Sequence, residues 1–164
     1  MDKLKVYIDN RQKSIKIPSG LRLLVRRCCN ATLANEGFEG SAEVNVTFVD
    51  DVQIKELNVQ YRHKDTATDV LSFPMGENGR FDLNPDTGAY VLGDVVISLE
   101  TATVQAEKYG HSLQHEVAFL TVHSMLHILG YDHEQGGIEA VRMHEHEDVI
   151  MNALGFSRDV YEEG

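Results

Sequence analysis

Three histidines in the C-terminal third of this 164-residue chain have the spacing of ligands for one metal ion. His123 and His127 are four residues apart, and His133 follows after a glycine at position 130. On a helix, positions i and i+4 lie on the same face, about 6 Å apart along the axis, so both imidazoles can reach one ion. Gly130 permits a turn that brings His133 back as a third ligand. Three protein ligands leave a tetrahedral site with one position for water, which is typical of a catalytic metal.

Neutral imidazole ligands suit zinc, nickel, copper and iron. A bound zinc ion lowers the pKa of its water to about 7, which gives hydroxide at neutral pH. We therefore expect one zinc-type ion. A carboxylate often holds a metal-bound imidazole from behind, and Asp132 and Glu116 are the candidates, although Asp132 could equally be a turn residue. The remaining histidines of this region are expected to be solvated or to support the site; they are His111, His115, His144 and His146.

Alternation of apolar and polar residues predicts the strands that surround this segment. We expect strands at residues 4–9, 14–17, 42–50, 70–73 and 91–98, with a turn at 10–13 and a hairpin loop at 75–90.

Capping residues and the period of 3.6 predict the helices. Helices are expected to begin at Ser19, at Asp50 or Asp51, at Ser98, at Ser112 and near residue 138, and the one that begins at Ser112 carries His123 and His127. Strands mix with helices early and helices alone follow, which indicates an α+β or mixed α/β fold.

The length of 164 residues suits one domain, here 1–164, that needs no disulfides to fold. The adjacent Cys28 and Cys29 are expected to be reduced, half-buried thiols on a helix. The chain has no apolar run near the roughly 18 residues of a membrane span and no apolar signal core, so we expect a cytoplasmic protein with no membrane partner. The formal net charge of −11 counts against tight electrostatic binding of nucleic acid, but leaves room for a small basic patch.

Three motifs lie in order along the chain. Residues 57–74 contain LN, YR and TDVLSFP, residues 92–98 are LGDVVIS, and residues 123–133 are HSMLHILGYDH. Together they resemble the motifs of the bacterial YbeY family of metal-dependent endoribonucleases, the rRNA maturation factors, whose signature is H-G-x-L-H-L-x-G-Y-D-H. The end of the chain, from Met143 through Glu147, is also similar, so that the resemblance covers about residues 44–156. Ser124 departs from the usual glycine.

The resemblance implies an α+β domain of about four to five short strands in a mixed sheet, about five helices, and a metal site on a late helix and the following glycine turn. It implies one zinc ion on His123, His127 and His133, with nickel or another divalent transition metal as alternatives. Arg62 corresponds to the family's catalytic-site arginine, which fits because a guanidinium donates two parallel hydrogen bonds to a phosphate. For the proton of the attacking water, the residues themselves leave two acceptors open, Asp132 or a second water, because Ser124 cannot act as a base.

The implied activity is cleavage of single-stranded RNA in 16S rRNA 3′-end maturation and ribosome quality control. RNA, on or near the small ribosomal subunit, is then the main partner, with ribosomal or assembly-factor proteins as further ones. Two alternatives remain at this stage. A zinc peptidase or amide hydrolase shares the H-x-x-x-H helix, but its H-E-x-x-H motif needs glutamate where this chain has Ser124. A non-catalytic ribosome assembly factor would use the metal only structurally.

Overall fold

A computed structural model describes residues 3–132 and 136–156 of the chain. In this part, five helices pack with a four-stranded mixed sheet, which confirms the α+β prediction. The strand order is β1-β2-β4-β3, in which β1, β2 and β4 run parallel and β3 runs antiparallel to β4. The elements are β1 (Leu4–Asn10), α1 (Leu21–Asn35), β2 (Ala42–Val49), α2 (Asp51–Arg62), β3 (Val70–Pro74), β4 (Tyr90–Ser98), α3 (Leu99–Tyr109), α4 (Leu113–Ile128) and α5 (Gly137–Ala153).

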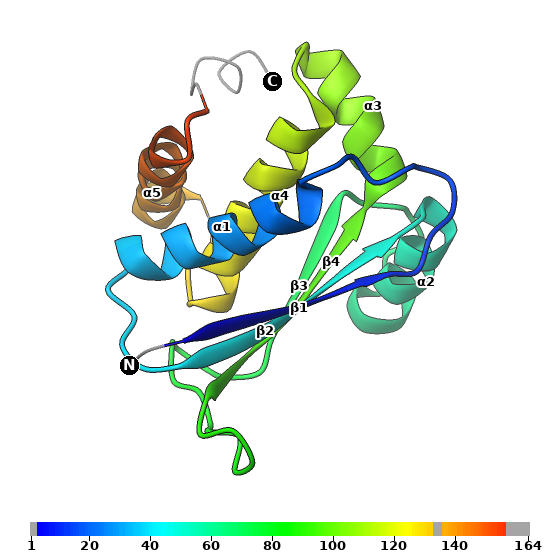
Figure 1. The fold of residues 1–164 in the computed structure, drawn as a ribbon. Coiled ribbons are helices and arrows are strands. Elements are labelled where there is room, and N and C mark those ends of the chain that lie inside the picture. The colour runs from blue at the N-terminus through cyan, green and yellow to red at the C-terminus, as the bar shows by residue number, and fades with distance from the viewer. Residues whose placement is uncertain (1–2, 133–135, 157–164) are drawn as a thin grey trace.

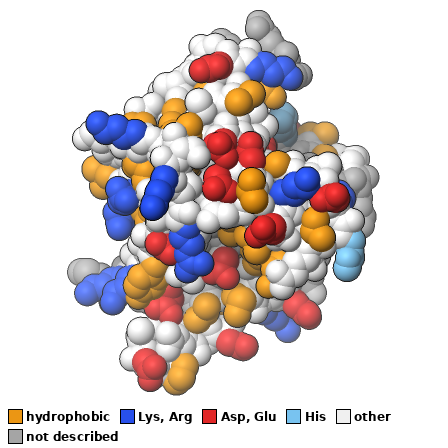
Figure 2. Space-filling model, turned by 90° about the vertical axis from the view of Figure 1, so that its right-hand side faces the viewer, with side chains coloured by type: hydrophobic (Ala, Val, Ile, Leu, Met, Phe, Trp, Pro, Cys, Tyr) orange, Lys and Arg blue, Asp and Glu red, His pale blue; other side chains and the backbone are white. Residues whose placement is uncertain are grey.

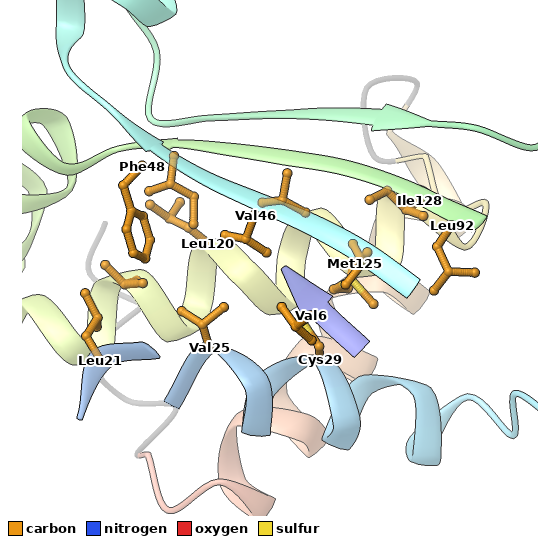
Figure 3. Close-up of a cluster of buried hydrophobic side chains, with 14 of the residues drawn as sticks. Val6, Leu21, Val25, Cys29, Val46, Phe48, Leu92, Leu120, Met125 and Ile128 are labelled. Atoms are coloured by element: carbon orange, nitrogen blue, oxygen red, sulfur yellow. The ribbon is translucent and has the colours of Figure 1, made fainter. Parts of the chain in front are cut away.

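The sheet separates two unequal layers. Helices α1 and α4 lie together on one face, with α5 beside them, and α2 lies on the other face near one end (Figure 1). The main core fills the space between the sheet and the pair α1 and α4. Figure 3 shows Leu120, Met125 and Ile128 of α4 among the side chains of this core. Because these three side chains hold α4 against the sheet, the orientation of the remaining faces of the helix is fixed.

The expected strand at 14–17 is wrong, so the turn expected at 10–13 does not lead into a paired strand. These residues are irregular, and β1 pairs in parallel with β2 instead. Gln12 satisfies the backbone of Ile15 in place of a strand partner: its amide oxygen accepts from the Ile15 N–H at 2.8 Å, and its amide nitrogen donates to the Ile15 carbonyl at 2.9 Å. Ile15 and Ile17 still pack against the core. Their alternation therefore reflects burial without strand pairing.

Most helix starts follow the predicted caps. Asp50 caps α2 in a capping box with Gln53, and Ser98 and Ser112 cap α3 and α4 through hydrogen bonds to backbone N–H groups. The predicted Ser19 cap is wrong, since α1 begins after Gly20 with no side-chain cap. Strand β2 alternates as predicted, with Val44, Val46 and Phe48 facing the core.

The two cysteines are fully buried on α1, deeper than the half-buried position expected. Burial raises the pKa of the Cys28 thiol to about 12 and raises that of Cys29 as well, so both remain protonated at neutral pH. In the described part of the chain, no helix combines the length and apolarity that a membrane crossing requires. The prediction of one domain spanning residues 1–164 stays a prediction, because both ends lie outside the described residues.

Candidate metal centre

His123 and His127 come together on α4 as their spacing predicts. Their ring centroids are 4.7 Å apart, with the rings nearly perpendicular at 83°. Phe119, one turn earlier, packs on His123 with a centroid distance of 5.8 Å. The two imidazoles are therefore neighbours on one face of the helix, within reach of a common ion.

Each of these imidazoles uses its Nδ1 atom for a hydrogen bond inside the protein. The Nδ1–H of His123 donates to Oε2 of Glu147 at 2.5 Å, and the Nδ1–H of His127 donates to the carbonyl of Tyr131 at 2.8 Å. A hydrogen bond at Nδ1 fixes the ring tautomer and makes Nε2 the nitrogen that a metal ion would bind. Both rings thus carry the outer support that is typical of metal-binding histidines.

The carboxylate behind His123 is Glu147, not Glu116 as expected. Glu147 lies on α5, is 2% exposed, and also accepts a hydrogen bond from His144 at 3.0 Å. The sequence held a signal for it, since Glu147 occupies a position four residues after the buried Met143 and three before the buried Ile150. A carboxylate within such an apolar stripe has to be paired when buried.

Glu116 instead pairs with His111, whose Nε2–H donates to it at 2.7 Å. Burial, with a smaller contribution from the charge of Asp69, raises the pKa of Glu116 to about 7. Glu116 and His111 therefore form a separate buried pair, seven and twelve residues before His123.

The third predicted ligand, His133, lies outside the described residues. Across residues 3–132 and 136–156, no group of three or more His, Cys, Asp or Glu side chains could hold a metal ion. Asp132, directly before His133, is half-buried in the coil after α4. The roles of His133 and Asp132 stay predictions.

The segment that leads to His133 is tied to two distant helices through Tyr131. The Tyr131 hydroxyl donates to Glu36, the C-cap residue of α1, at 2.6 Å, and Nδ1 of His146 on α5 bonds the other carboxylate oxygen of Glu36 at 2.6 Å. Burial raises the pKa of Glu36, but the hydrogen bonds from Tyr131 and His146 outweigh it and leave that pKa below its usual value. Partial burial, together with the hydrogen bond to the charged Glu36, raises the pKa of the half-buried Tyr131 hydroxyl to about 12. Glu36 is a support that sequence reasoning did not identify, whereas His146 was among the histidines expected to be solvated or to support the site.

Arg62 lies in the same cleft as the two histidines. This cleft, which we call the metal cleft, has a volume of about 670 Å³ and lies between the end of α2, strand β3 and helix α4. Arg62 is the last residue of α2 and is exposed. The structure therefore brings together His123, His127 and Arg62, which are separated by about sixty residues of sequence.

Strand β3 forms the wall of the metal cleft, and Ser124 attaches it to α4. The Ser124 hydroxyl is fully buried and lies 2.5 Å from that of Ser72. Asp69, directly before β3, accepts from the Val70 N–H at 2.7 Å and from the side-chain amide of Gln105 on α3 at 3.2 Å. The residue that departs from the family's glycine is thus a structural contact between helix and sheet.

A glycine in β4 lets β3 approach closely. A Cβ atom on Gly93, whose φ is +149°, would lie 2.3 Å from the carbonyl oxygen of Phe73. Glycine at this position allows the pairing of Phe73 with Asp94 and so positions Phe73 beside the metal cleft.

With this geometry established, comparison with known proteins identifies the family. The family model described as Endoribonuclease YbeY matches residues 7–155. The chain belongs to the endoribonuclease YbeY family. The chain is 49% identical over 160 residues to Endoribonuclease YbeY of Caldanaerobacter subterraneus subsp. tengcongensis, covering 94% of this chain and all of that one. It is 44% identical over 162 residues to the protein of that name from Moorella thermoacetica, again covering 94% of this chain and all of the relative.

A solved structure shares the fold. The solution structure of TM1509 from Thermotoga maritima superposes with a TM-score of 0.57, at 22% sequence identity, over 97% of this chain and 95% of that one. The resemblance stated from the sequence motifs is therefore confirmed for the YbeY family and for its α+β fold.

Proposed function

We propose that this chain is a single-strand-specific, metal-dependent endoribonuclease that acts in 16S rRNA 3′-end maturation and ribosome quality control. Membership of the endoribonuclease YbeY family supports RNA cleavage as the reaction. One observation about the structure carries the assignment to a site: Arg62, His123 and His127 line the same cleft. RNA of the small ribosomal subunit is the proposed partner, with ribosomal or assembly-factor proteins as further ones, and the cytoplasm is the proposed location.

The proposed cofactor is one zinc ion, held by His123, His127 and His133. The chemistry of the donor set fits such an ion, because the hydrogen bonds at Nδ1 direct Nε2 of both described imidazoles to ligation. When bound, the ion supplies an activated water at neutral pH or polarises a phosphate oxygen. Nickel and other divalent transition metals fit the same nitrogen ligands.

Arg62 is the proposed group for the scissile phosphate. Its guanidinium stays charged through the reaction and donates paired hydrogen bonds to phosphate oxygens, so it offsets the negative charge that builds up in the transition state. Asp132 is the proposed acceptor for the proton of the attacking water. Glu147 orients the imidazole of His123, and the Tyr131 carbonyl orients that of His127. The protein therefore holds both imidazoles in place before substrate binds.

The position of Ser124 disfavours the peptidase alternative. In H-E-x-x-H enzymes the glutamate after the first histidine is the general base. Here Ser124 is fully buried against Ser72, so that position neither carries a base nor faces the cleft.

The test is cleavage of single-stranded RNA together with metal analysis of the wild type, Arg62→Gln and His127→Ala. We expect about one ion per wild-type chain, retention of the ion with a loss of activity of about 10²- to 10³-fold in Arg62→Gln, and loss of both in His127→Ala. Arg22→Gln is the matched control, since Arg22 is also an exposed arginine but lies on α1. Circular dichroism is the check that each variant is folded. Equal cleavage by all four preparations would point to a contaminating nuclease and leave the assembly-factor alternative.

A further inference from the structure

A second groove adjoins the metal cleft on the face of the sheet that α1 and α4 leave open. This sheet groove has a volume of about 790 Å³ and is lined by β1, β2 and β4 together with one side of α2. Tyr61 and Phe73 line both the sheet groove and the metal cleft. An extended ligand bound across Arg62 and the two histidines can therefore continue into the sheet groove without leaving the protein surface.

Aromatic side chains stand at both ends of the sheet groove. Tyr61, at its junction with the metal cleft, is 57% exposed and contacts Phe73 edge to face with centroids 5.2 Å apart. Tyr7 of β1, on the far side, is 50% exposed. Exposed aromatic rings on an open sheet face are the usual platform on which proteins stack the unpaired bases of RNA.

Between these rings the groove presents hydrogen-bonding side chains suited to base edges. Asn45 donates to Asp94 at 2.9 Å across the two central strands, and Gln60 lines the α2 side. Asp94 belongs to the matched LGDVVIS motif, yet it faces the sheet groove and does not line the metal cleft. Amides and carboxylates accept from the amino groups of bases, and amides also donate to base carbonyls.

The net negative charge of the sheet groove favours the bases of an RNA over its phosphates as occupants. Asp9, Glu56 and Asp94 line it against one arginine, Arg11, which is already paired with Asp9 at 2.7 Å. Figure 2, viewed from the side on which α2 and α3 lie, shows acidic side chains gathered near the middle of that face, with Lys and Arg mostly toward its edges. A net negative groove repels the RNA backbone, whereas base edges carry no charge and offer donors to carboxylates.

We propose that the sheet groove binds the bases of single-stranded RNA adjacent to the scissile phosphate, with one base stacked on Tyr61 and the backbone turned outward to solvent. The inference rests on the proposed function and extends it to substrate binding. Base pairing would hide the stacking faces and edges, so the groove gives a physical reason for preferring single strands.

The test measures binding as well as cleavage. The fluorescence anisotropy of a labelled 12-nucleotide single-stranded RNA reports its affinity for the full chain at several salt concentrations. We expect Tyr61→Ala to weaken binding about 5- to 150-fold, the effect of losing one stacked base, and Tyr61→Phe to restore it. Tyr7→Ala should also weaken binding, while Leu23→Ala, at an exposed apolar residue of α1, should leave it unchanged.

The dependence of RNA affinity on salt concentration distinguishes the loss of a stacking contact from the loss of a charge or of the folded structure. Tyr61→Ala should leave the slope of log affinity against log salt unchanged, whereas Arg62→Gln should reduce it by about 0.7, the value for one phosphate contact on a single strand. Suppose the wild type binds and cuts the RNA, and Tyr61→Ala and Tyr7→Ala bind it as tightly as the wild type does. The proposal that the sheet groove binds bases is then wrong, and the proposed function stands. If the wild type neither binds nor cuts RNA, the proposed function fails.

A basic protein segment is the competing occupant of the sheet groove, and one further variant, Asp94→Asn, tests it. Binding of a lysine-rich peptide that Asp94→Asn abolishes, with RNA affinity unchanged in Tyr61→Ala, would overturn the proposal in favour of a protein partner. Failure of the peptide to compete with RNA supports the proposal.

Discussion

Replacing Glu147 by glutamine removes the negative charge beside His123 but keeps the shape of the side chain at position 147. The carboxylate accepts from the Nδ1–H of His123 at 2.5 Å and is 2% exposed, so water does not screen this contact. A glutamine oxygen can accept the same hydrogen bond, but it carries no charge. The variant therefore isolates the electrostatic part of the contact.

The expected loss follows from the strength of the two kinds of hydrogen bond. Bonds to a charged group contribute about 1.5–3 kcal/mol, and those between neutral groups about 0.5–1.5 kcal/mol. The difference, about 1–1.5 kcal/mol, corresponds to roughly tenfold in zinc affinity. This agrees with the 10- to 100-fold loss of affinity or activity that typically follows when the support of a metal ligand is removed.

Zinc affinity is measured by competition with a chromophoric chelator, with unfolding in urea as a check on stability. Glu116→Gln is the matched control, because it also removes a buried carboxylate hydrogen-bonded to a histidine, but His111 is not a proposed ligand. His144→Ala should change zinc affinity less than Glu147→Gln does, because the His144 side chain is 67% exposed and lies behind Glu147. If folded Glu147→Gln binds zinc as tightly as the wild type and as Glu116→Gln, then Glu147 does not support a metal ligand and the reasoning is refuted.

Two further predictions concern the stability of the fold, one at the contact between α4 and β3 and one at the buried Glu116. Ser124→Gly removes the contact with Ser72 and a better helix former, so the free energy of unfolding should fall by about 1–2 kcal/mol; an unchanged urea midpoint would contradict this. Glu116 has a folded pKa raised from 4.5 to about 7, so it holds its proton to higher pH in the folded state and wild-type stability should fall as pH rises from 4.5 through about 7. Glu116→Gln should lessen that fall in melting temperatures measured from pH 5 to 8, and an identical pH slope in both proteins would contradict it.

Local sequence determined the parts of the site that lie within one element. The spacing of His123 and His127 sets their separation because the helical repeat fixes which residues share a face. Asp50, Ser98 and Ser112 mark helix starts because a cap bonds backbone only two or three residues away. These interactions have the range of one helical turn and can be predicted from the residues alone.

The pairing of the strands depends on residues much farther apart in sequence than one helical turn. Alternation predicted β1 and β2 but also a strand at 14–17, since it reports burial and does not identify the partner. The parallel pairing of β1 with β2 arises because helix α1 between them buries its apolar side on the same face of the sheet. Only the packed layers decide this choice.

The chemistry of the site depended on tertiary structure in the same way. Glu147 reaches His123 from another helix, and Arg62 shares a cleft with both histidines from across the sheet edge. The sequence resemblance predicted Arg62 as a site residue, but it predicted neither the neighbours of Arg62 nor the sheet groove beside it. A buried carboxylate can pair with any histidine that packing brings near, as Glu116 and Glu147 show with His111 and His123. The sequence thus determined which residues are suited to metal and phosphate chemistry, while the packing of α4 against β3 and α5 decided which of them meet.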